Sequence, residues 1–293
     1  MPSSFDSSQI RRAFGRAAPA YAATAVLQRE VESRLLERLD YLERAPTRIL
    51  DVGCGPGRAS ALLARRWPKA QVLACDVALP MLREARRQAG FWRPRFTRLQ
   101  ADARALPLAD ASVDLLFSNV CIQWIDDLPA LFAEWRRVLA PGGLLTLSSF
   151  GPATLHELRA AFGAVDDEPH VSPFAPIQAL GDALLASGFR DPVLDTDLFT
   201  LTYADARGLM RELRTIGAGN ALAGRRRTLT GKQHMQRVFA AYEPFRREGR
   251  LPASYEVLYA HAWGPEPGQP RRSGGADLAA VPLARIPIRR RGE

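Results

Sequence analysis

The stretch AspValGlyCysGlyProGly at residues 51–57 decides the fold of this 293-residue chain. It follows a short apolar run, ThrArgIleLeu at 47–50, and precedes a helical pattern. A glycine-rich turn between a strand and a helix lets the backbone approach a ligand closely, and the helix N-terminus beyond it offers free N–H groups to an anion. A dinucleotide fingerprint would place its third glycine at position 58, but that residue is Arg58 and the glycine is Gly57. The turn therefore predicts a ligand site at the edge of a sheet and disfavours NAD as the ligand.

Strands and helices alternate around this turn. Short apolar runs separated by helical patterns are typical of a parallel sheet with helices on both faces. We therefore predict an α/β fold with a Rossmann-like, mostly parallel sheet. The predicted strands are 47–52, 71–76, 96–102, 113–119 and 144–150, and the predicted helices between them include 79–89 and 129–139.

The flanking segments predict additions to this core, which itself spans 47–150. Residues 1–46 have the pattern of a helical cap, because four apolar residues in their second half repeat at helical spacing. Residues 151–265 are expected to complete the sheet, with a basic, mostly helical lid at 204–248. Residues 266–293 are rich in Pro, Gly and Arg, so we expect a disordered basic tail. The elements predicted within 151–265 are helices at 153–163 and 176–187 and strands at 192–203 and 255–263.

The composition is that of an ordinary globular chain, with 47% hydrophobic and 24% charged residues. This balance excludes an intrinsically disordered protein, a collagen-like fibre and a disulfide scaffold. Three cysteines without a CxxC pair favour a reducing cytoplasm. No targeting segment or bilayer-spanning run is visible, so we expect a soluble cytoplasmic protein. Four histidines show no spacing that indicates a metal site or a general base, so we assign them to the surface or to packing. They are His156, His170, His234 and His261.

An acidic residue follows the second predicted strand. Asp76 ends the run 71–76 and lies 23 residues after Gly53. A carboxylate at that place can accept hydrogen bonds from both ribose hydroxyls of a nucleoside ligand. The alternative is a helix N-cap, which is a common role for Asp before a helix. The glycines upstream favour the ligand role.

The spacing of Gly53, Gly55 and Gly57 resembles that of the Rossmann-like class I methyltransferases, which use S-adenosylmethionine. The resemblance implies S-adenosylmethionine as the cofactor, with Asp102 at the adenine amine. It also places Asn119 at the carboxyl end of the fourth strand, where ligands bind in open α/β sheets. The cofactor-binding residues that it implies are Gln28, Asp51, Gly53, Gly55, Gly57, Asp76, Met81, Asp102 and Asn119.

Segments outside the core resemble one family in particular. They are PheGlyArgAlaAlaProAlaTyr (14–21), LeuGlnArgGluVal (27–31), SerAsnValCysIleGlnTrp (118–124), LeuArgThrIleGlyAlaGlyAsn (213–220), ThrGlyLysGlnHisMet (230–235) and LeuProAlaSerTyrGluValLeuTyr (251–259). Together they are similar to the malonyl-[acyl-carrier protein] O-methyltransferases of biotin synthesis, over nearly the whole chain up to about Gly264. This chain has Arg214 and Thr215 where the family often has Lys and Gly.

The resemblance implies methyl transfer to the free carboxylate of a malonyl thioester on acyl carrier protein. The methyl ester would mask a charge, so that the short acyl chain can be elongated toward pimeloyl and biotin. A malonyl carboxylate is already ionised near neutral pH, so alignment and water exclusion dominate and no general base is required. The acceptor residues implied are Tyr21, Gln123 and Arg214, and the candidate lids are 1–46 and 204–248.

Tyr21 and Gln28 are seven residues apart, and therefore on one face if their segment is a single helix. A helix that caps the cofactor pocket would then place Tyr21 on the acceptor. An ordinary half-buried tyrosine is an equally good interpretation. Trp124 follows Gln123 near the carboxyl edge of the sheet, where it is either a pocket residue or part of the core.

The net charge of +9 is concentrated late in the chain, since residues 205–250 carry +7. Of the 40 cationic residues, 38 are arginine, which weakens any argument from the isoelectric point. The triplet Arg225, Arg226 and Arg227 lies in this segment. A solvated basic loop is one interpretation. A docking surface for the acidic acyl carrier protein is the other.

Other functions remain open at this point. A small-molecule methyltransferase that acts on a quinone ring or a small acid would share every cofactor motif and differ only in the lid. A nucleic-acid methyltransferase would explain the arginines, but no aromatic-rich RNA motif accompanies them, so we expect neither a nucleic-acid nor a membrane partner. A non-catalytic assembly factor would predict a degraded glycine turn, whereas this turn is intact. A dehydrogenase is disfavoured by Arg58.

Overall fold

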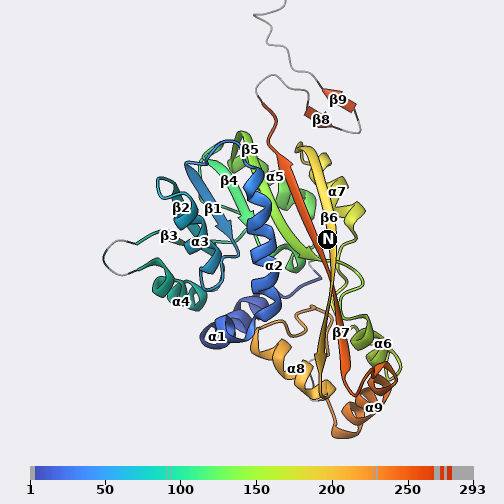
Figure 1. Cartoon of the computed structure of the whole chain (residues 1–293). Helices are drawn as coiled ribbons and strands as arrows, with labels where there is room; N and C mark the ends of the chain where they lie inside the picture. Colours follow the sequence, from blue (N-terminus) through green and yellow to red (C-terminus); the bar gives the residue numbers. More distant parts are fainter. Residues whose placement is uncertain are drawn as a thin grey trace, which may run out of the picture.

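A computed structural model describes residues 4–90, 92, 94–226, 228, 230–266, 271–273 and 276–278. Its central sheet contains β1 (Arg48–Val52), β2 (Gln71–Asp76), β3 (Thr97–Gln100), β4 (Val113–Ser118), β5 (Leu139–Phe150), β6 (Arg190–Tyr203) and β7 (Leu251–Trp263). The strand order is β3-β2-β1-β4-β5-β7-β6. Strands β1 to β5 run parallel, and β7 is antiparallel to both of its neighbours, β5 and β6. The predicted α/β fold with a mostly parallel sheet is confirmed (Figure 1).

Helices cover both faces of this sheet. The helices of the described residues are α1 (Ser7–Thr24), α2 (Val26–Glu37), η1 (Arg38–Tyr41), α3 (Arg58–Arg66), α4 (Leu79–Ala89), η2 (Ile122–Trp124), α5 (Leu128–Val138), α6 (His156–Gly163), α7 (Ile177–Ala186), α8 (Ala206–Thr215), α9 (Lys232–Tyr242) and η3 (Glu243–Phe245), and those that pack on the core sheet include α2, α3 and α4 on one face and α5 and α7 on the other. Neighbouring residues of a strand point to opposite faces. Ile49 accordingly belongs to the core formed with α2, α3 and α4, whereas Leu50 belongs to the core formed with α5 and α7. Burial on both faces explains the uninterrupted apolar runs of the parallel strands.

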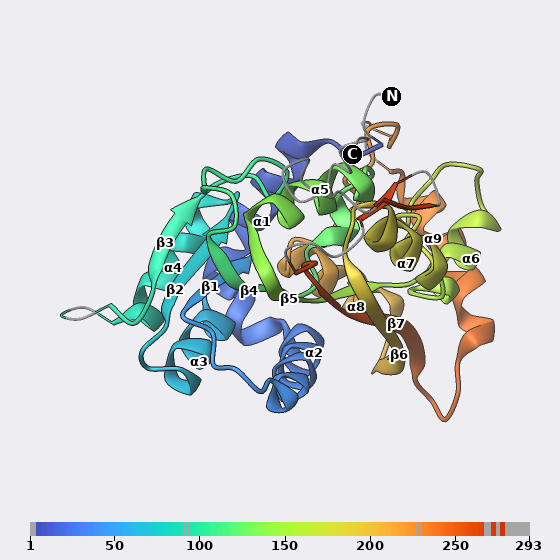
Figure 2. The same ribbon diagram turned by 90° about the horizontal axis from the view of Figure 1, so that it is seen from above.

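The last two strands carry the additions to the core. β6 and β7 pair over almost their whole lengths, from Arg190 opposite Trp263 to Tyr203 opposite Leu251. Helix α8 follows β6, and α9 precedes β7. Both views show α6 and α9 around the far part of these strands, on the opposite side of the molecule from α3 and α4 (Figures 1 and 2). The elongated β6–β7 pair is therefore the support for the predicted lid.

Three sequence expectations need correction. Tyr21 and Gln28 do not lie on one continuous helix, since α1 ends at Thr24 and α2 begins at Val26. Residues 204–248 are less helical than expected, because the described residues between α8 and α9 (216–226, 228, 230 and 231) form no helix. The tail is not without structure in its described part, where β8 (Arg271–Ser273) pairs antiparallel with β9 (Ala276–Leu278). The sequence has two glycines between these strands, a hairpin signal that the argument from composition passes over.

Across the described residues, none of the helices is both long enough and apolar enough to cross a bilayer.

Candidate active site

The glycines of the turn after β1 have two structural roles: two of them allow close packing, and one leaves space for a ligand. A Cβ on Gly53 would lie 2.5 Å from the Cys121 sulfur, and one on Gly57 would lie 2.9 Å from the Ala85 Cβ, so these two glycines permit close packing. A Cβ on Gly55 would meet nothing nearer than the Tyr21 ring at 4.0 Å. All three have positive φ values, which glycine adopts readily. Gly55 therefore leaves open space beneath Tyr21, where a ligand can approach the backbone.

Asp76 lies at the carboxyl end of β2, beside this turn. Its two carboxylate oxygens accept hydrogen bonds from the Gly55 N–H at 2.9 Å and from the Ala78 N–H at 2.8 Å. Ala78 is the N-cap residue of α4, so Asp76 does not cap that helix. The carboxylate also lines a cavity at this edge of the sheet. Its burial is almost complete and raises its pKa to about 6.

Two adjoining cavities of about 120 and 210 Å³ lie along the carboxyl edge of the sheet, and we call them together the cofactor cleft. Tyr21, Gly53, Gly55 and Asn119 line both parts. The structure brings eight of the nine predicted cofactor residues to this cleft, while Gly57 packs behind it. Asp76, Met81 and Asp102 line the first part, and Gln28 and Asp51 line the second.

Helix α1 covers the cleft. Its residues Ala17 and Ala18 pack against Ala78 and Met81 at the start of α4. Phe14 contributes a further lining side chain and contacts the Trp124 ring edge-on at 5.6 Å between centroids. Access to the cofactor cleft therefore depends on α1, in agreement with the cap expected from residues 1–46.

A larger cavity of about 820 Å³ lies beyond α1, and we call it the acceptor cavity. It contains the predicted residues Gln123 and Arg214, together with Arg16, which the sequence argument missed. Gln28 lines both the acceptor cavity and the cofactor cleft, and so does Trp124. The two spaces therefore meet at Gln28 and Trp124.

The polar groups of the acceptor cavity favour an anion. Arg16 and Arg214 are exposed, and within the described part of the chain their guanidinium groups have no hydrogen-bond or ion-pair partner. The Gln123 amide nitrogen donates to the Val120 carbonyl at 2.8 Å, whereas its buried Oε1 has no partner. Tyr21, at the cleft side of the junction, has a pKa well above its usual range because its surroundings desolvate the phenol. Its hydroxyl therefore remains a neutral donor.

Comparison with known proteins identifies the family of the chain. The model of a methyltransferase domain matches residues 49–143. The malonyl-[acyl-carrier protein] O-methyltransferase of Xylella fastidiosa is 56% identical over 289 residues, which is 98% of each chain. The protein of the same name from Gallionella capsiferriformans is 46% identical, over 92% of this chain and 95% of that one. The chain belongs to the malonyl-[acyl-carrier protein] O-methyltransferase family.

Solved structures show the fold of this methyltransferase independently. The YcgJ protein of Bacillus subtilis has a TM-score of 0.56 at 15% identity, and the match covers 80% of this chain and 99% of that one. Phosphoethanolamine N-methyltransferase 2 of Haemonchus contortus, in complex with S-adenosylmethionine, has a TM-score of 0.50 at 18% identity. That match covers 80% of this chain and 52% of the other.

The methyl donor of the enzyme is S-adenosylmethionine, and the cleft suits it. The donor carries a sulfonium and an ammonium group, and three buried carboxyl groups lie at the cleft. Burial raises the pKa of Asp51 to about 7, and it raises that of Glu32 to about 7 against the opposing effect of Arg58. A cationic ligand would favour the ionised forms of these two carboxyl groups and of Asp76. Glu32 was missed because a helical Glu beside an Arg is an ordinary surface pattern.

Asn119 acts in this methyltransferase partly as a connector. Its amide nitrogen donates to the Gln28 carbonyl at 3.1 Å, and its oxygen accepts from the Ser148 hydroxyl at 2.7 Å. It thus links β4 and β5 to α2. The next residue, Val120, has a φ of 48°, which is rare for a β-branched residue. The backbone is therefore strained beside the cleft, a feature that no sequence pattern signals.

Asp102 has a partner that the sequence argument did not foresee. Arg104 lines the cleft beside it and donates to both of its carboxylate oxygens, at 2.9 and 2.6 Å. This pairing lowers the pKa of Asp102. An adenine amine would therefore share the carboxylate with Arg104.

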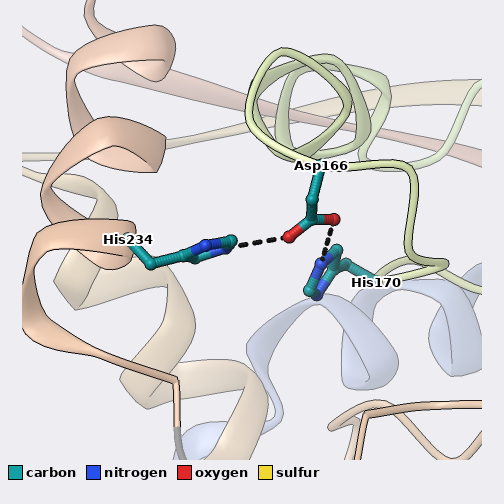
Figure 3. A group of neighbouring side chains, drawn as sticks. All are labelled: Asp166, His170 and His234. Carbon is teal, nitrogen blue, oxygen red and sulfur yellow. Dashed lines mark hydrogen bonds and ion pairs between the residues drawn. The ribbon is translucent and has the colours of Figure 1, made fainter.

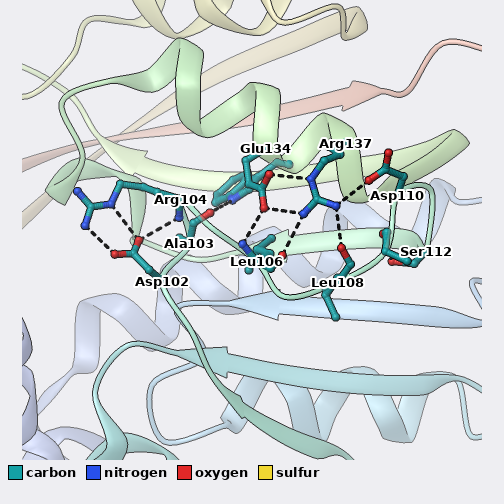
Figure 4. A network of polar contacts seen from close by, with 11 residues as sticks. Asp102, Ala103, Arg104, Leu106, Leu108, Asp110, Ser112, Glu134 and Arg137 are labelled. Atoms are coloured by element: carbon teal, nitrogen blue, oxygen red, sulfur yellow. Dashed lines mark hydrogen bonds and ion pairs between the residues drawn. The ribbon is translucent and has the colours of Figure 1, made fainter.

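Helix α5 holds the loop that carries this pair (Figure 4). The Arg137 guanidinium donates to the carbonyls of Leu106 and Leu108, at 3.0 and 2.7 Å. Glu134 accepts from the Leu106 N–H at 2.7 Å. The Trp135 indole nitrogen donates to the Ala103 carbonyl at 3.0 Å. The loop after β3 is thereby fixed against the sheet, which positions Asp102 at the cleft.

The break between α1 and α2 changes the argument for Tyr21 and Gln28. The two residues share no helical face, because Ala25 separates the two helices. Both still line the second part of the cleft, since the helices meet above the glycine turn. The predicted proximity is present, but the stated reason is wrong.

Proposed function

We propose that this enzyme transfers the methyl group of S-adenosylmethionine to the free carboxylate of a malonyl thioester on acyl carrier protein. The observation that carries the proposal is a pair of arginines, Arg16 and Arg214, that have no partner among the described residues and line a cavity that joins the cofactor cleft. An anionic acceptor matches these groups, and relatives with 56% and 46% identity bear the corresponding name.

The chemistry needs little beyond alignment. S-adenosylmethionine supplies an electrophilic methyl group on a positively charged sulfur. A malonyl carboxylate is ionised at neutral pH and is itself the nucleophile, so the protein need not remove a proton. Arg16 and Arg214 would hold the acceptor, and the Tyr21 hydroxyl would donate to its carboxylate from the cleft, whereas the free Gln123 Oε1 is an acceptor and would face an N–H group of the ligand. Helix α1 and Trp124 would exclude water.

The order of charges supports this arrangement. The cleft holds the buried acids Glu32, Asp51 and Asp76, whereas the acceptor cavity holds two free cations. A cationic donor and an anionic acceptor are thus each directed to the side of opposite charge. The product ester has lost its charge and interacts less with the arginines, which favours its release.

The docking of the carrier protein is the finer part of the proposal. Of the triplet expected to dock it, Arg225 is committed elsewhere, because it pairs with Asp6 at 3.2 Å at the start of α1. Arg226 is exposed and contacts the Thr228 hydroxyl at 2.7 Å, while Arg227 lies outside the described residues. We propose that Arg226 and the exposed arginines at the cavity mouth steer the acidic carrier.

The proposal includes the metabolic setting. The methyl ester would let a short dicarboxylic chain pass through elongation as the first intermediate of pimeloyl and biotin synthesis. We place the reaction in the cytoplasm, since all three cysteines are free thiols.

Transfer of labelled methyl groups from S-adenosylmethionine to competing acceptors tests the proposal. The acceptors are malonyl carrier protein, malonyl-coenzyme A, quinone precursors and RNA. We expect the carrier-bound malonyl group to have the highest kcat/KM, and its product to lose label on ester hydrolysis. A higher kcat/KM for a quinone precursor would instead support a small-molecule methyltransferase. Label in RNA would overturn the carboxylate acceptor altogether.

A further inference from the structure

Three side chains that are distant in sequence converge outside the active site (Figure 3). Asp166, His170 and His234 each present one potential ligand atom, and these atoms all lie within 4.8 Å of one another. The His170 Nε2 is 2.8 Å from one Asp166 carboxylate oxygen, and the His234 Nε2 is 2.9 Å from the other. The carboxylate thus lies between two imidazoles. The expectation that these histidines serve only the surface or packing overlooks this cluster.

The fold fixes the three groups independently. Asp166 follows the end of α6, and one of its oxygens also accepts from the Glu168 N–H at 3.0 Å. The His170 ring stacks on Phe162, with 3.9 Å between centroids and 14° between planes. His234 lies in the first turn of α9, which packs against α6. Packing therefore sets the ring orientations before any ligand binds, as a preorganised site requires.

One ion pair in the cluster lacks the geometry of a hydrogen bond. The Asp166 Oδ2 and the His234 Nε2 are buried and only 2.9 Å apart, yet neither makes a hydrogen bond. Buried polar atoms without partners are uncommon and unfavourable. A cation between these atoms would satisfy both lone pairs.

We propose that Asp166, His170 and His234 bind a zinc ion. Two imidazoles and one carboxylate are a donor set that suits Zn²⁺, with a water molecule as the fourth ligand. Ligand atoms at about 2.1 Å from a tetrahedral centre are about 3.4 Å apart. Because one Asp166 oxygen would ligate, its contact with the nearer imidazole would widen by about half an ångström, and the other ligand atoms, which lie within 4.8 Å of one another, would adjust to a similar spacing. Side-chain rotation is sufficient for a change of that size.

The bound zinc ion would stabilise one wall of the acceptor cavity. His170 lines this cavity, and so does Met235, the neighbour of His234. The ion would tie α9 to the loop after α6, and so fix one wall of the cavity. None of the three ligands lines the cofactor cleft, so the ion would be structural and would take no part in methyl transfer.

Zinc binding by the full-length protein tests the proposal. Protein treated with a chelator would be titrated with Zn²⁺ against a chromophoric competitor, and its melting temperature measured with and without the metal. We expect one equivalent to bind and to raise the melting temperature. His234→Ala and Asp166→Asn should each weaken binding by on the order of 100-fold or more, since each removes a ligand. His156→Ala, on exposed α6 surface outside the cluster, is the matched control and should bind as the parent does.

Cobalt substitution separates this site from the cysteines. The Co²⁺ form should show d–d bands of a nitrogen and oxygen site without an intense thiolate charge-transfer band. Unchanged zinc affinity in both ligand variants would overturn the proposal, as would a thiolate band. Failure of the parent protein to bind zinc more tightly than His234→Ala would also overturn it and leave an Asp–His ion pair. These readouts do not depend on the identity of the methyl acceptor.

Discussion

The cofactor cleft and the acceptor cavity are built in different ways. The cleft lies on turns at the ends of neighbouring parallel strands, and Asp76 and Asn119 are held there by hydrogen bonds from the fold itself. The acceptor cavity is lined by α1, α8 and the irregular loops between distant elements, and its arginines are free. The sheet therefore holds the residues of the cofactor cleft in place, whereas the segments added to the core form the acceptor cavity.

The two spaces also differ in charge. Buried carboxyl groups surround the cleft, and exposed guanidinium groups line the cavity. This difference implies that variants of the cleft should alter cofactor binding, whereas variants of the cavity should alter acceptor use.

Gly53→Ala should weaken the binding of S-adenosylhomocysteine by on the order of 100-fold, which is about 2.7 kcal/mol. The left-handed conformation at φ 73° is unfavourable for alanine, and the added Cβ would lie 2.5 Å from the Cys121 sulfur. Calorimetry measures the affinity. Gly163→Ala is the control, because a Cβ there meets nothing within 4 Å. Undiminished affinity in a folded Gly53→Ala protein would show that this turn does not shape the cleft.

Asp76→Ala should weaken the same ligand by roughly 1.5–3 kcal/mol, because a charged acceptor of hydroxyl hydrogen bonds is lost. The KM for the acceptor should change little. Asp182→Ala, on an exposed position of α7, provides a matched control. A large rise in the KM for the acceptor with unchanged cofactor affinity would show that Asp76 acts on the acceptor and not on the cofactor.

The affinity for S-adenosylmethionine should rise with pH between 5 and 7.5. Burial raises the pKa of Asp76 to about 6 and that of Asp51 to about 7, and a cationic ligand favours their ionised forms. Binding at pH 5 must therefore release protons, and a single carboxyl with a pKa near 6 weakens affinity by about tenfold there. Calorimetry in buffers of different ionisation enthalpy would count the protons released. An affinity that does not change with pH would mean that the ligand does not interact with these carboxyl groups.

Arg16→Ala and Arg214→Ala should each lower kcat/KM for the carrier-bound malonyl group by about tenfold, as expected when a charged hydrogen bond is lost. Cofactor affinity should remain unchanged. Arg211→Ala is the control, since this residue is exposed on the same helix as Arg214 and does not line the cavity. Tyr21→Phe should also lower turnover more than cofactor affinity. Parallel losses in cofactor affinity would show that the two arginines act on the cofactor cleft, and that Tyr21, which lines the cleft, contacts the cofactor and not the acceptor.

Arg226→Glu should produce the smallest effect, a few-fold fall in kcat/KM at low salt that disappears near ~0.5 M salt. Rim charges act mainly on the rate of encounter. A truncated malonyl thioester without protein or phosphates should be used as before. Arg225→Ala should instead lower the melting temperature, because Arg225 supports the N-terminus of α1 through Asp6. Wild-type kinetics for Arg226→Glu at low salt would remove it from the docking surface.

The sequence alone determined the parallel sheet, and it predicted which residues line the cleft at its carboxyl edge. Both depend on local patterns: apolar runs of strand length, a glycine turn, and an acid at the end of the next strand. Parallel strands bring their carboxyl ends to one edge, so residues that follow them must meet there. That rule explains why Gly55, Asp76 and Asn119 were found without coordinates.

Tertiary structure alone decided the rest. Arg16 joins Arg214 only because α1 packs against α8, and Glu32 reaches the cleft only because α2 crosses the glycine turn. Arg225 is not available to the predicted docking surface, because its guanidinium donates to the Asp6 carboxylate, 219 residues earlier in the sequence. His170 and His234 meet because α6 and α9 pack together. Contacts of this kind join elements whose order along the chain says nothing of their distance in space, so no local pattern encodes them.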